Sequence, residues 1–163
     1  MQEYEFIKQI IEGGYSEYSE NRLTKLFAAV YNSSKDFRTA FNEIWIQKKL
    51  RFDVYADTHV SYSNKYIPDL VIRNKETDDE VAIIEVKVDA DLTEKQLNNY
   101  SKIVESKVIK IALVKHYFEF DVSGWKVIRW SQVFRLLSDK FKKDNYANIL
   151  FSHLKEYGMA SKN

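Results

Sequence analysis

The spacing of apolar residues predicts three helices in the first third of the chain. Residues 3–12 form a short amphipathic segment that Gly13-Gly14 ends. The next helix begins after a cap at Ser16 or Ser19, and its apolar side chains recur at i, i+3, i+4 and i+7, at Leu23, Leu26, Phe27 and Val30. A third stripe, made by Phe37, Phe41, Ile44 and Trp45, predicts a helix that ends near Leu50.

The apolar pattern changes after residue 50, and the rest of the chain alternates strands with helices. Residues 52–62 are rich in β-branched and aromatic side chains and predict a strand. Further strands are expected over 66–73, 80–88, 108–115 and 126–130, and helices over 93–105, 131–143 and 146–157. The strands 66–73 and 80–88 are separated only by a polar turn, so they form a hairpin.

This order of elements predicts an α/β fold. The step from strand 80–88 through helix 93–105 to strand 108–115 favours parallel pairing with a right-handed crossover. A mixed central sheet of four to five strands, flanked by helices and with N-terminal and C-terminal helices, follows. The 163 residues contain no repeat or linker, so residues 1–163 are expected to form a single domain.

Composition excludes several function classes. The absence of cysteine removes disulfide scaffolds, thiol nucleophiles and iron–sulfur clusters, and the three histidines are too far apart for a local zinc motif. A formal net charge of +1 argues against a polybasic binder. No apolar run approaches the ~20 residues that a membrane span needs, and the N-terminus carries no secretory signal, so we expect a cytoplasmic protein without a membrane partner.

Strand 80–88 carries two opposite charges where a buried strand is expected. Its even-numbered positions are uniformly apolar, whereas Glu85 and Lys87 follow Val81 and Ile83 on the other face. Burying charges is costly unless they are paired or hold a metal ion. A structural ion pair, or a strand end that reaches solvent, is the alternative interpretation.

The hairpin brings a second acid to this strand. If it turns symmetrically about Thr77, Asp69 lies opposite Glu85. Like charges in this position are destabilising, and a divalent cation between them would remove the repulsion. Carboxylates with an otherwise solvated coordination sphere suit Mg²⁺. A slipped register would separate the acids and is the alternative.

These residues resemble the core signature of the PD-(D/E)XK nuclease superfamily. Pro68-Asp69, a hairpin, and Glu85-Val86-Lys87 match that signature in order. The segment Ser19–Thr24 resembles the N-terminal helix that contributes a glutamate, here Glu20. Gln96-Leu97-Asn98-Asn99-Tyr100 resembles the Gln-x-x-x-Tyr helix of many members, and Trp130–Phe134 resembles the late helix of small stand-alone relatives.

The resemblance implies a restriction-endonuclease-like core and a Mg²⁺-dependent nuclease, with Mn²⁺ able to substitute. DNA is the expected substrate, with RNA as the alternative. It implies that Asp69, Glu85 and the backbone carbonyl of Val86 hold the metal, with Glu20 reaching it directly or through water. Lys87 would position the attacking water and stabilise charge on the phosphate. Gln96 completes the expected catalytic set, and a homodimer is left open.

Several of these residues also have ordinary structural explanations. Glu20 has a routine role at the positive end of its helix, and Gln96 can close a capping box with Thr93. The basic clusters 47–51 and 140–143 are more often solvated helix ends than phosphate contacts, and the histidines are expected to be at the surface or satisfied internally. A nuclease-like domain that binds nucleic acid or assembles without catalysis is the alternative function.

Overall fold

The computed structural model describes residues 20–58, 67–88, 93–116 and 121–160. The expected helix over 3–12, the caps Ser16 and Ser19, and the end of the expected strand 52–62 lie outside these ranges. The elements are α2 (Glu20–Ser33), α3 (Lys35–Trp45), β1 (Val54–Asp57), β2 (Leu70–Asn74), β3 (Glu80–Lys87), α4 (Glu94–Ser101), β4 (Ile109–Val114), β5 (Trp125–Arg129), α5 (Trp130–Leu137), the 3₁₀ turn η1 (Ser138–Phe141) and α6 (Asn145–Glu156).

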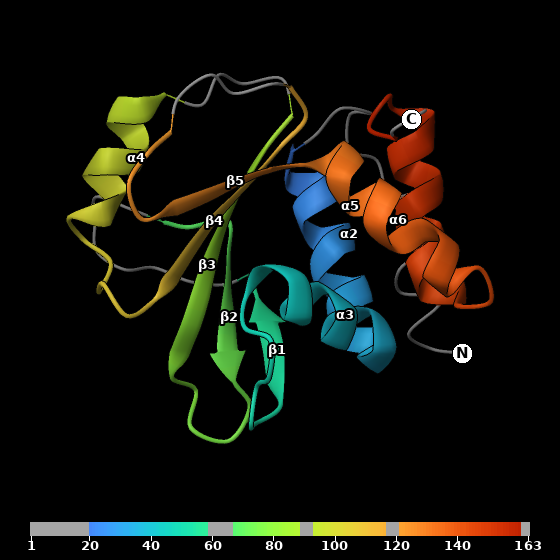
Figure 1. Ribbon diagram of the computed structural model, residues 1–163, viewed down its shortest axis with the longest axis horizontal. Coiled ribbons are helices and arrows are strands. Elements are labelled where there is room, and N and C mark those ends of the chain that lie inside the picture. The colour runs from blue at the N-terminus through green and yellow to red at the C-terminus, as the bar shows by residue number, and fades with distance from the viewer. Residues whose placement is uncertain (1–19, 59–66, 89–92, 117–120, 161–163) are drawn as a thin grey trace.

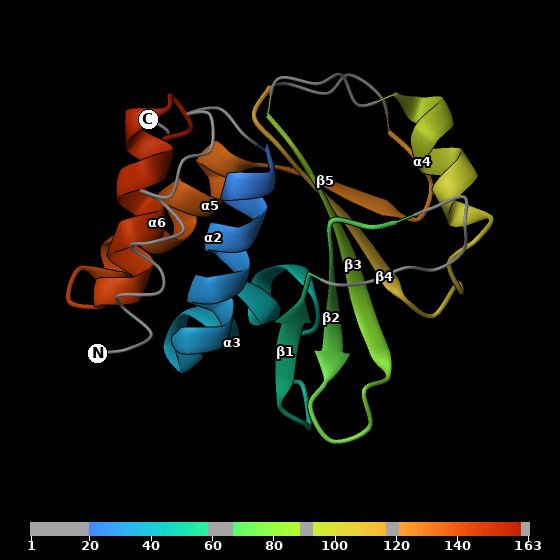
Figure 2. The same ribbon diagram turned by 180° about the vertical axis from the view of Figure 1, so that it is seen from behind.

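A five-stranded mixed sheet forms the centre of the fold, as the sequence predicts. Its strands lie in the order β1-β2-β3-β4-β5. β1, β2 and β3 pair antiparallel, whereas β3, β4 and β5 pair parallel. Figures 1 and 2 show α2, α3, α5 and α6 grouped on one side of the sheet and α4 on the other.

Each face of the sheet has its own hydrophobic core. The larger core joins Ile84 and Val86 of β3 to aromatic side chains of α2 and α3, among them Phe27, Phe37 and Phe41. The smaller core joins Ile83 to Val71, Leu97 and Trp125. The predicted separation of even-numbered and odd-numbered positions is therefore confirmed from Ala82 onward, and Glu85 belongs to the face that α4 covers. Val81, predicted on the face of Ile83, packs instead against the larger core, because the register of the hairpin shifts there.

Several element boundaries differ from the expectation. α3 ends at Trp45 and not near Leu50, because the amides of Ile46 and Gln47 both donate to the carbonyl of Asn42. α4 ends at Ser101, where the amides of Ile103 and Val104 fold back onto a single carbonyl, that of Tyr100. β2 starts at Leu70, just after Pro68, which has no amide to donate.

The helix expected over 131–143 is also shorter than the apolar pattern suggests, whereas α6 matches the helix expected over 146–157 to within one residue. α5 stops at Leu137 and is followed by the 3₁₀ turn η1, so the expected single helix over 131–143 is two elements. Within the described ranges, none of the helices combines the length and apolar character needed to cross a membrane.

Two helix caps connect the N-terminal and C-terminal helices. The hydroxyl of Ser34, the N-cap of α3, accepts from the amide of Phe37 and donates to the carboxylate of Asp144. Asp144 is itself the N-cap of α6 and accepts from the amide of Ala147 at 3.1 Å. This shared cap fixes the two helix starts against each other, 110 residues apart in sequence.

His153 is buried in α6, with only 5% of its surface exposed. Its ring lies 4.6 Å from that of Tyr157, centroid to centroid. Burial, with a smaller contribution from the nearby charge of Arg22, lowers the pKa of His153 to about 4. The imidazole is therefore neutral in the folded protein at neutral pH.

This burial predicts an acid-sensitive fold. Between about pH 6.5 and pH 4 the unfolded chain binds a proton at His153 that the folded protein does not, so stability falls as pH falls through that window. The loss is roughly 3 kcal/mol for this one group. Urea unfolding at pH 7.5 and pH 4.5 should show a smaller difference in His153→Gln than in wild type. His116→Gln, which changes an exposed histidine, serves as control; an unchanged pH dependence in His153→Gln would contradict the prediction.

Candidate functional site

The register of the β2–β3 hairpin is the one that the sequence predicts. Leu70 pairs with Ile84, and Val71 pairs with Ile83. Continuing this register by one position places Asp69, which directly precedes β2, opposite Glu85. The register shifts by one residue between Ile72 and Arg73, so a β-bulge lies on the turn side of these pairs.

Asp69 and Glu85 form a carboxyl–carboxyl pair. Glu85 is only 4% exposed, and its carboxyl lies close enough to Asp69 to act on the Asp69 pKa. Asp69 Oδ2 accepts from the amide of Val86 at 2.7 Å.

The pKa of Asp69 depends on its burial and on the charged groups near it. Burial raises the pKa of the Asp69 carboxyl above its ordinary value, and the charge of Glu20 raises it further. The Val86 amide, Lys87 and Glu85 act in the opposite direction without cancelling the effect of burial. The pair therefore favours a proton, or another cation, between its oxygens.

Glu20 and Lys87 are brought to the same place from different elements. Glu20 is the first residue of α2, and its Oε1 accepts from the amide of Val88 at 3.0 Å, which connects the start of that helix to the end of β3. Lys87 follows Glu85 by two residues, on the same face of β3. Both charges act on Asp69, so the structure gathers all four of these sequence-predicted residues at one end of the hairpin.

Gln96 has the local role that the sequence offered as its alternative. It closes a capping box with Thr93: its Oε1 accepts from the Thr93 amide at 3.3 Å, and the Thr93 hydroxyl accepts from the Gln96 amide at 3.1 Å. Its catalytic role stays a prediction. One turn later in α4, Tyr100 is close enough for the charges of Glu85, Lys87 and Asp69 to act on its pKa, which is raised chiefly by burial. The sequence motif contained Tyr100 without assigning it to the site.

The donor set suits a small, hard cation. Across the described ranges, no group of three or more acidic or histidine side chains is arranged to hold a metal ion. Mg²⁺ does not require such a group, because proteins commonly hold it through one or two carboxylates, with water and substrate phosphates completing the octahedron. Asp69 and Glu85 are the two carboxylates that could hold such a cation at this end of the hairpin.

Comparison of the chain with protein-family models, with curated proteins and with solved structures finds no match. The assignment of chemistry to this site therefore depends on its residues and their geometry.

Removal of either acid should affect cation binding more than folding. Asp69→Asn, which keeps an acceptor for the Val86 amide, and Glu85→Gln should each weaken Mn²⁺ binding by roughly 10- to 100-fold or more. Without divalent cations, each should leave the melting temperature unchanged or raise it by a few degrees, because the remaining acid no longer faces a like charge. Calorimetric titration with Mn²⁺ and thermal unfolding measure the two effects.

Glu76→Gln is the matched control, since Glu76 is an exposed carboxylate in the turn of the same hairpin. It should bind Mn²⁺ like wild type. Unchanged Mn²⁺ binding in both Asp69→Asn and Glu85→Gln would remove the metal from these residues.

Proposed function

We propose that the protein is a metal-dependent nuclease that hydrolyses phosphodiester bonds, with DNA as the proposed substrate. The observation that carries the proposal is the pair formed by buried Glu85 and partly buried Asp69, with the charges of Lys87 and Glu20 acting on it. The order of these residues along the chain, which resembles the PD-(D/E)XK signature, supports it as well. The cytoplasm is its proposed setting.

Asp69 and Glu85 would hold Mg²⁺ or Mn²⁺, together with the backbone carbonyl of Val86. Such a cation, when bound, polarises the scissile phosphate and lowers the pKa of a bound water. Glu20 would contribute directly or through water, from a position that its bond to the Val88 amide fixes. The carboxylates thus have two tasks, to neutralise the cation and to orient it against the phosphate.

Lys87 has a different task, because a protonated amine has no lone pair to offer a metal. Its ammonium shares a face of β3 with Glu85, where it would orient the attacking water and stabilise charge that develops on the phosphate. The partly buried position of Lys87 strengthens this effect, since a charge that is shielded from water acts through a lower effective dielectric constant.

One observation favours a second candidate, a non-catalytic module that binds nucleic acid or assembles with a partner. The oxygens of Asp69 and Glu20 accept from the amides of Val86 and Val88, so both acids also have structural partners at the end of β3. In that case the acids would maintain the strand end, and cleavage would be absent with or without Mg²⁺.

The Lys87→Met variant separates catalysis from structure. It keeps most of the aliphatic stem but removes the charge, so we expect near-native melting temperature and retained Mn²⁺ binding. Single-turnover cleavage of plasmid and of single-stranded DNA in Mg²⁺ should fall by about 10²–10³-fold or more, as when one preorganised electrostatic group is removed.

Lys95→Met provides the control, because Lys95 is an exposed lysine of the neighbouring helix α4. It should cleave like wild type. If Lys87 were only a structural partner of Glu85, Lys87→Met would instead lower stability by a few kcal/mol and leave cleavage per folded molecule unchanged. Full cleavage by Lys87→Met would refute the mechanism.

A further inference from the structure

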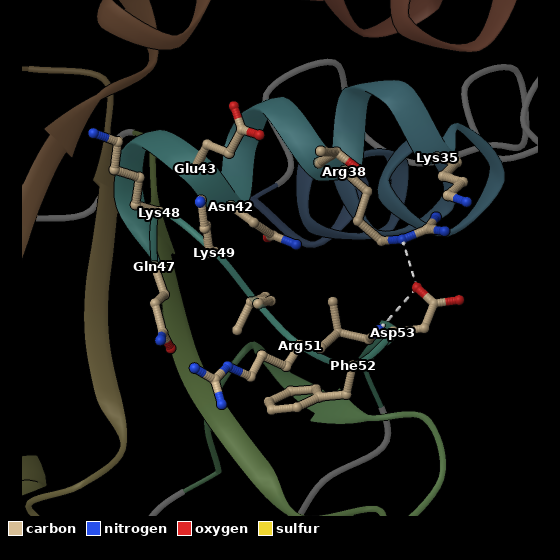
Figure 3. Close-up of a pocket in the computed structure, with 13 residues that line it drawn as sticks. Lys35, Arg38, Asn42, Glu43, Gln47, Lys48, Lys49, Arg51, Phe52 and Asp53 are labelled. Atoms are coloured by element: carbon tan, nitrogen blue, oxygen red, sulfur yellow. Dashed lines mark hydrogen bonds and ion pairs between the residues drawn. The ribbon is translucent and has the colours of Figure 1, made fainter.

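A hollow of about 650 Å³ lies between α3 and the segment 47–54 that leads into β1. Figure 3 shows Arg38 and Asn42 extending from α3 toward this segment, which supplies the opposite wall. We call this hollow, together with its lining, the α3 groove. The sequence marked residues 47–51 only as a solvated helix end.

The α3 groove is separate from the carboxyl pair. Val54, at the groove, pairs through β1 with Asn74 at the turn end of β2, whereas Asp69 precedes the opposite end of that strand. At about 3.3 Å per residue, the two places are about 17 Å apart along β2. They also differ in sheet face, because α3 packs on the face of Ile84 and Val86 and Glu85 is on the other.

The lining of the groove is more positively charged than the net charge of the whole protein would indicate. Its lining includes five cationic side chains, Lys35, Arg38, Lys48, Lys49 and Arg51, against the acids Glu43 and Asp53. The formal net charge of the entire protein is only +1. A surface of this kind attracts a polyanion.

Most of these cations are available to a ligand. Arg38 is the exception, since it donates to the carbonyls of Tyr31 and Asn32 and lies 3.4 Å from Asp53. Lys35, Lys48, Lys49 and Arg51 have no acidic partner within 4.0 Å in the part of the chain that the structure describes. Ligand phosphates could therefore contact them without breaking an ion pair.

The groove also presents an aromatic ring to solvent. Phe52 is 38% exposed, and in Figure 3 it extends to the same side of its segment as Arg51. A base stacked on the phenyl ring would remove apolar surface from water, while the neighbouring guanidinium would contact phosphate. In a duplex the faces of the bases are already stacked on one another, so an exposed ring between cations selects unpaired bases.

We propose that the α3 groove binds single-stranded nucleic acid, with Lys48, Lys49 and Arg51 contacting phosphates and Phe52 stacking on a base. The proposal goes beyond the nuclease function, because it requires neither a metal ion nor cleavage. DNA and RNA single strands share the chemistry that these residues recognise.

Fluorescence anisotropy with labelled 12-nucleotide single-stranded DNA, the RNA of the same sequence and the corresponding DNA duplex tests the proposal. Measurements in EDTA prevent cleavage. Lys48→Glu/Lys49→Glu should bind single strands about tenfold more weakly or worse, and its log–log salt slope should be shallower by about 0.7 for each lost phosphate contact. Lys140→Glu/Lys143→Glu makes the same charge change at exposed lysines outside the groove and should bind like wild type.

Phe52→Leu tests the stacking separately. It keeps an apolar side chain but removes the ring, so affinity for single strands should fall roughly 5- to 100-fold with the salt slope unchanged. Phe52→Tyr should restore binding, and melting temperatures check that the variants fold. Both single strands should bind more tightly than the duplex, and the tighter of the two identifies the natural ligand.

Three results would overturn the proposal: equal losses in the two double lysine variants, wild-type binding by Phe52→Leu, or duplex binding as tight as single-strand binding. Its failure is distinguishable from failure of the nuclease proposal. Binding without any cleavage in Mg²⁺ refutes the nuclease proposal and leaves the groove proposal intact. Cleavage without groove-dependent binding refutes the groove proposal and leaves the nuclease proposal intact.

Discussion

The alternation of side chains along β3 is the constraint on which both cores and the candidate site depend. β3 lies between β2 and β4 and is buried without interruption from Ala82 to Val86. Ile84 and Val86 contact the helices of one face, and Ile83 contacts the α4 side. A slip of one residue in pairing would exchange these sets, so packing on two sides fixes the register strongly. Glu85 is buried as a consequence of that register.

A β-bulge then decides which residue Glu85 faces. Next to the turn, Arg73 pairs with Glu80, but beyond the bulge the pairing advances by one residue on β3. Without that extra residue, Asp69 would lie opposite Ile84, away from the side of the sheet where Glu85 lies. The symmetric turn assumed from the sequence arrives at the right register, although the real hairpin is asymmetric. The alternation of apolar residues does not reveal the bulge. Arg73, next to the bulge, donates hydrogen bonds to Asp57 and to the carbonyl of Asp78.

The end of α3, and the groove beside it, could not be predicted from the spacing of apolar residues. Local spacing favours helix to about Leu50, yet the chain leaves the helix at Trp45. The ammonium of Lys126 donates to the carbonyl of Trp45 at 2.7 Å, a contact across 81 positions that helps to satisfy the exposed helix end. Because residues 47–53 are not helical, their basic side chains line a groove and are not spread around a helix. The pairing of β2 with β3 and of β3 with β4 follows from local pattern. The position of Asp69 opposite Glu85 also requires the bulge, and the groove forms because α3 ends earlier than the local pattern predicts.

The buried polar groups of the protein differ in how they are satisfied. Tyr31 donates to Asn42, Arg38 donates to backbone carbonyls, and Lys110 donates to the carbonyl of Val108, so each pair joins a donor to an acceptor. Asp69 and Glu85 instead bring two acids together, and burial raises the pKa of Asp69. Under the proposed function, a cation held by Asp69 and Glu85 offsets the cost of placing two acids side by side at the end of β3.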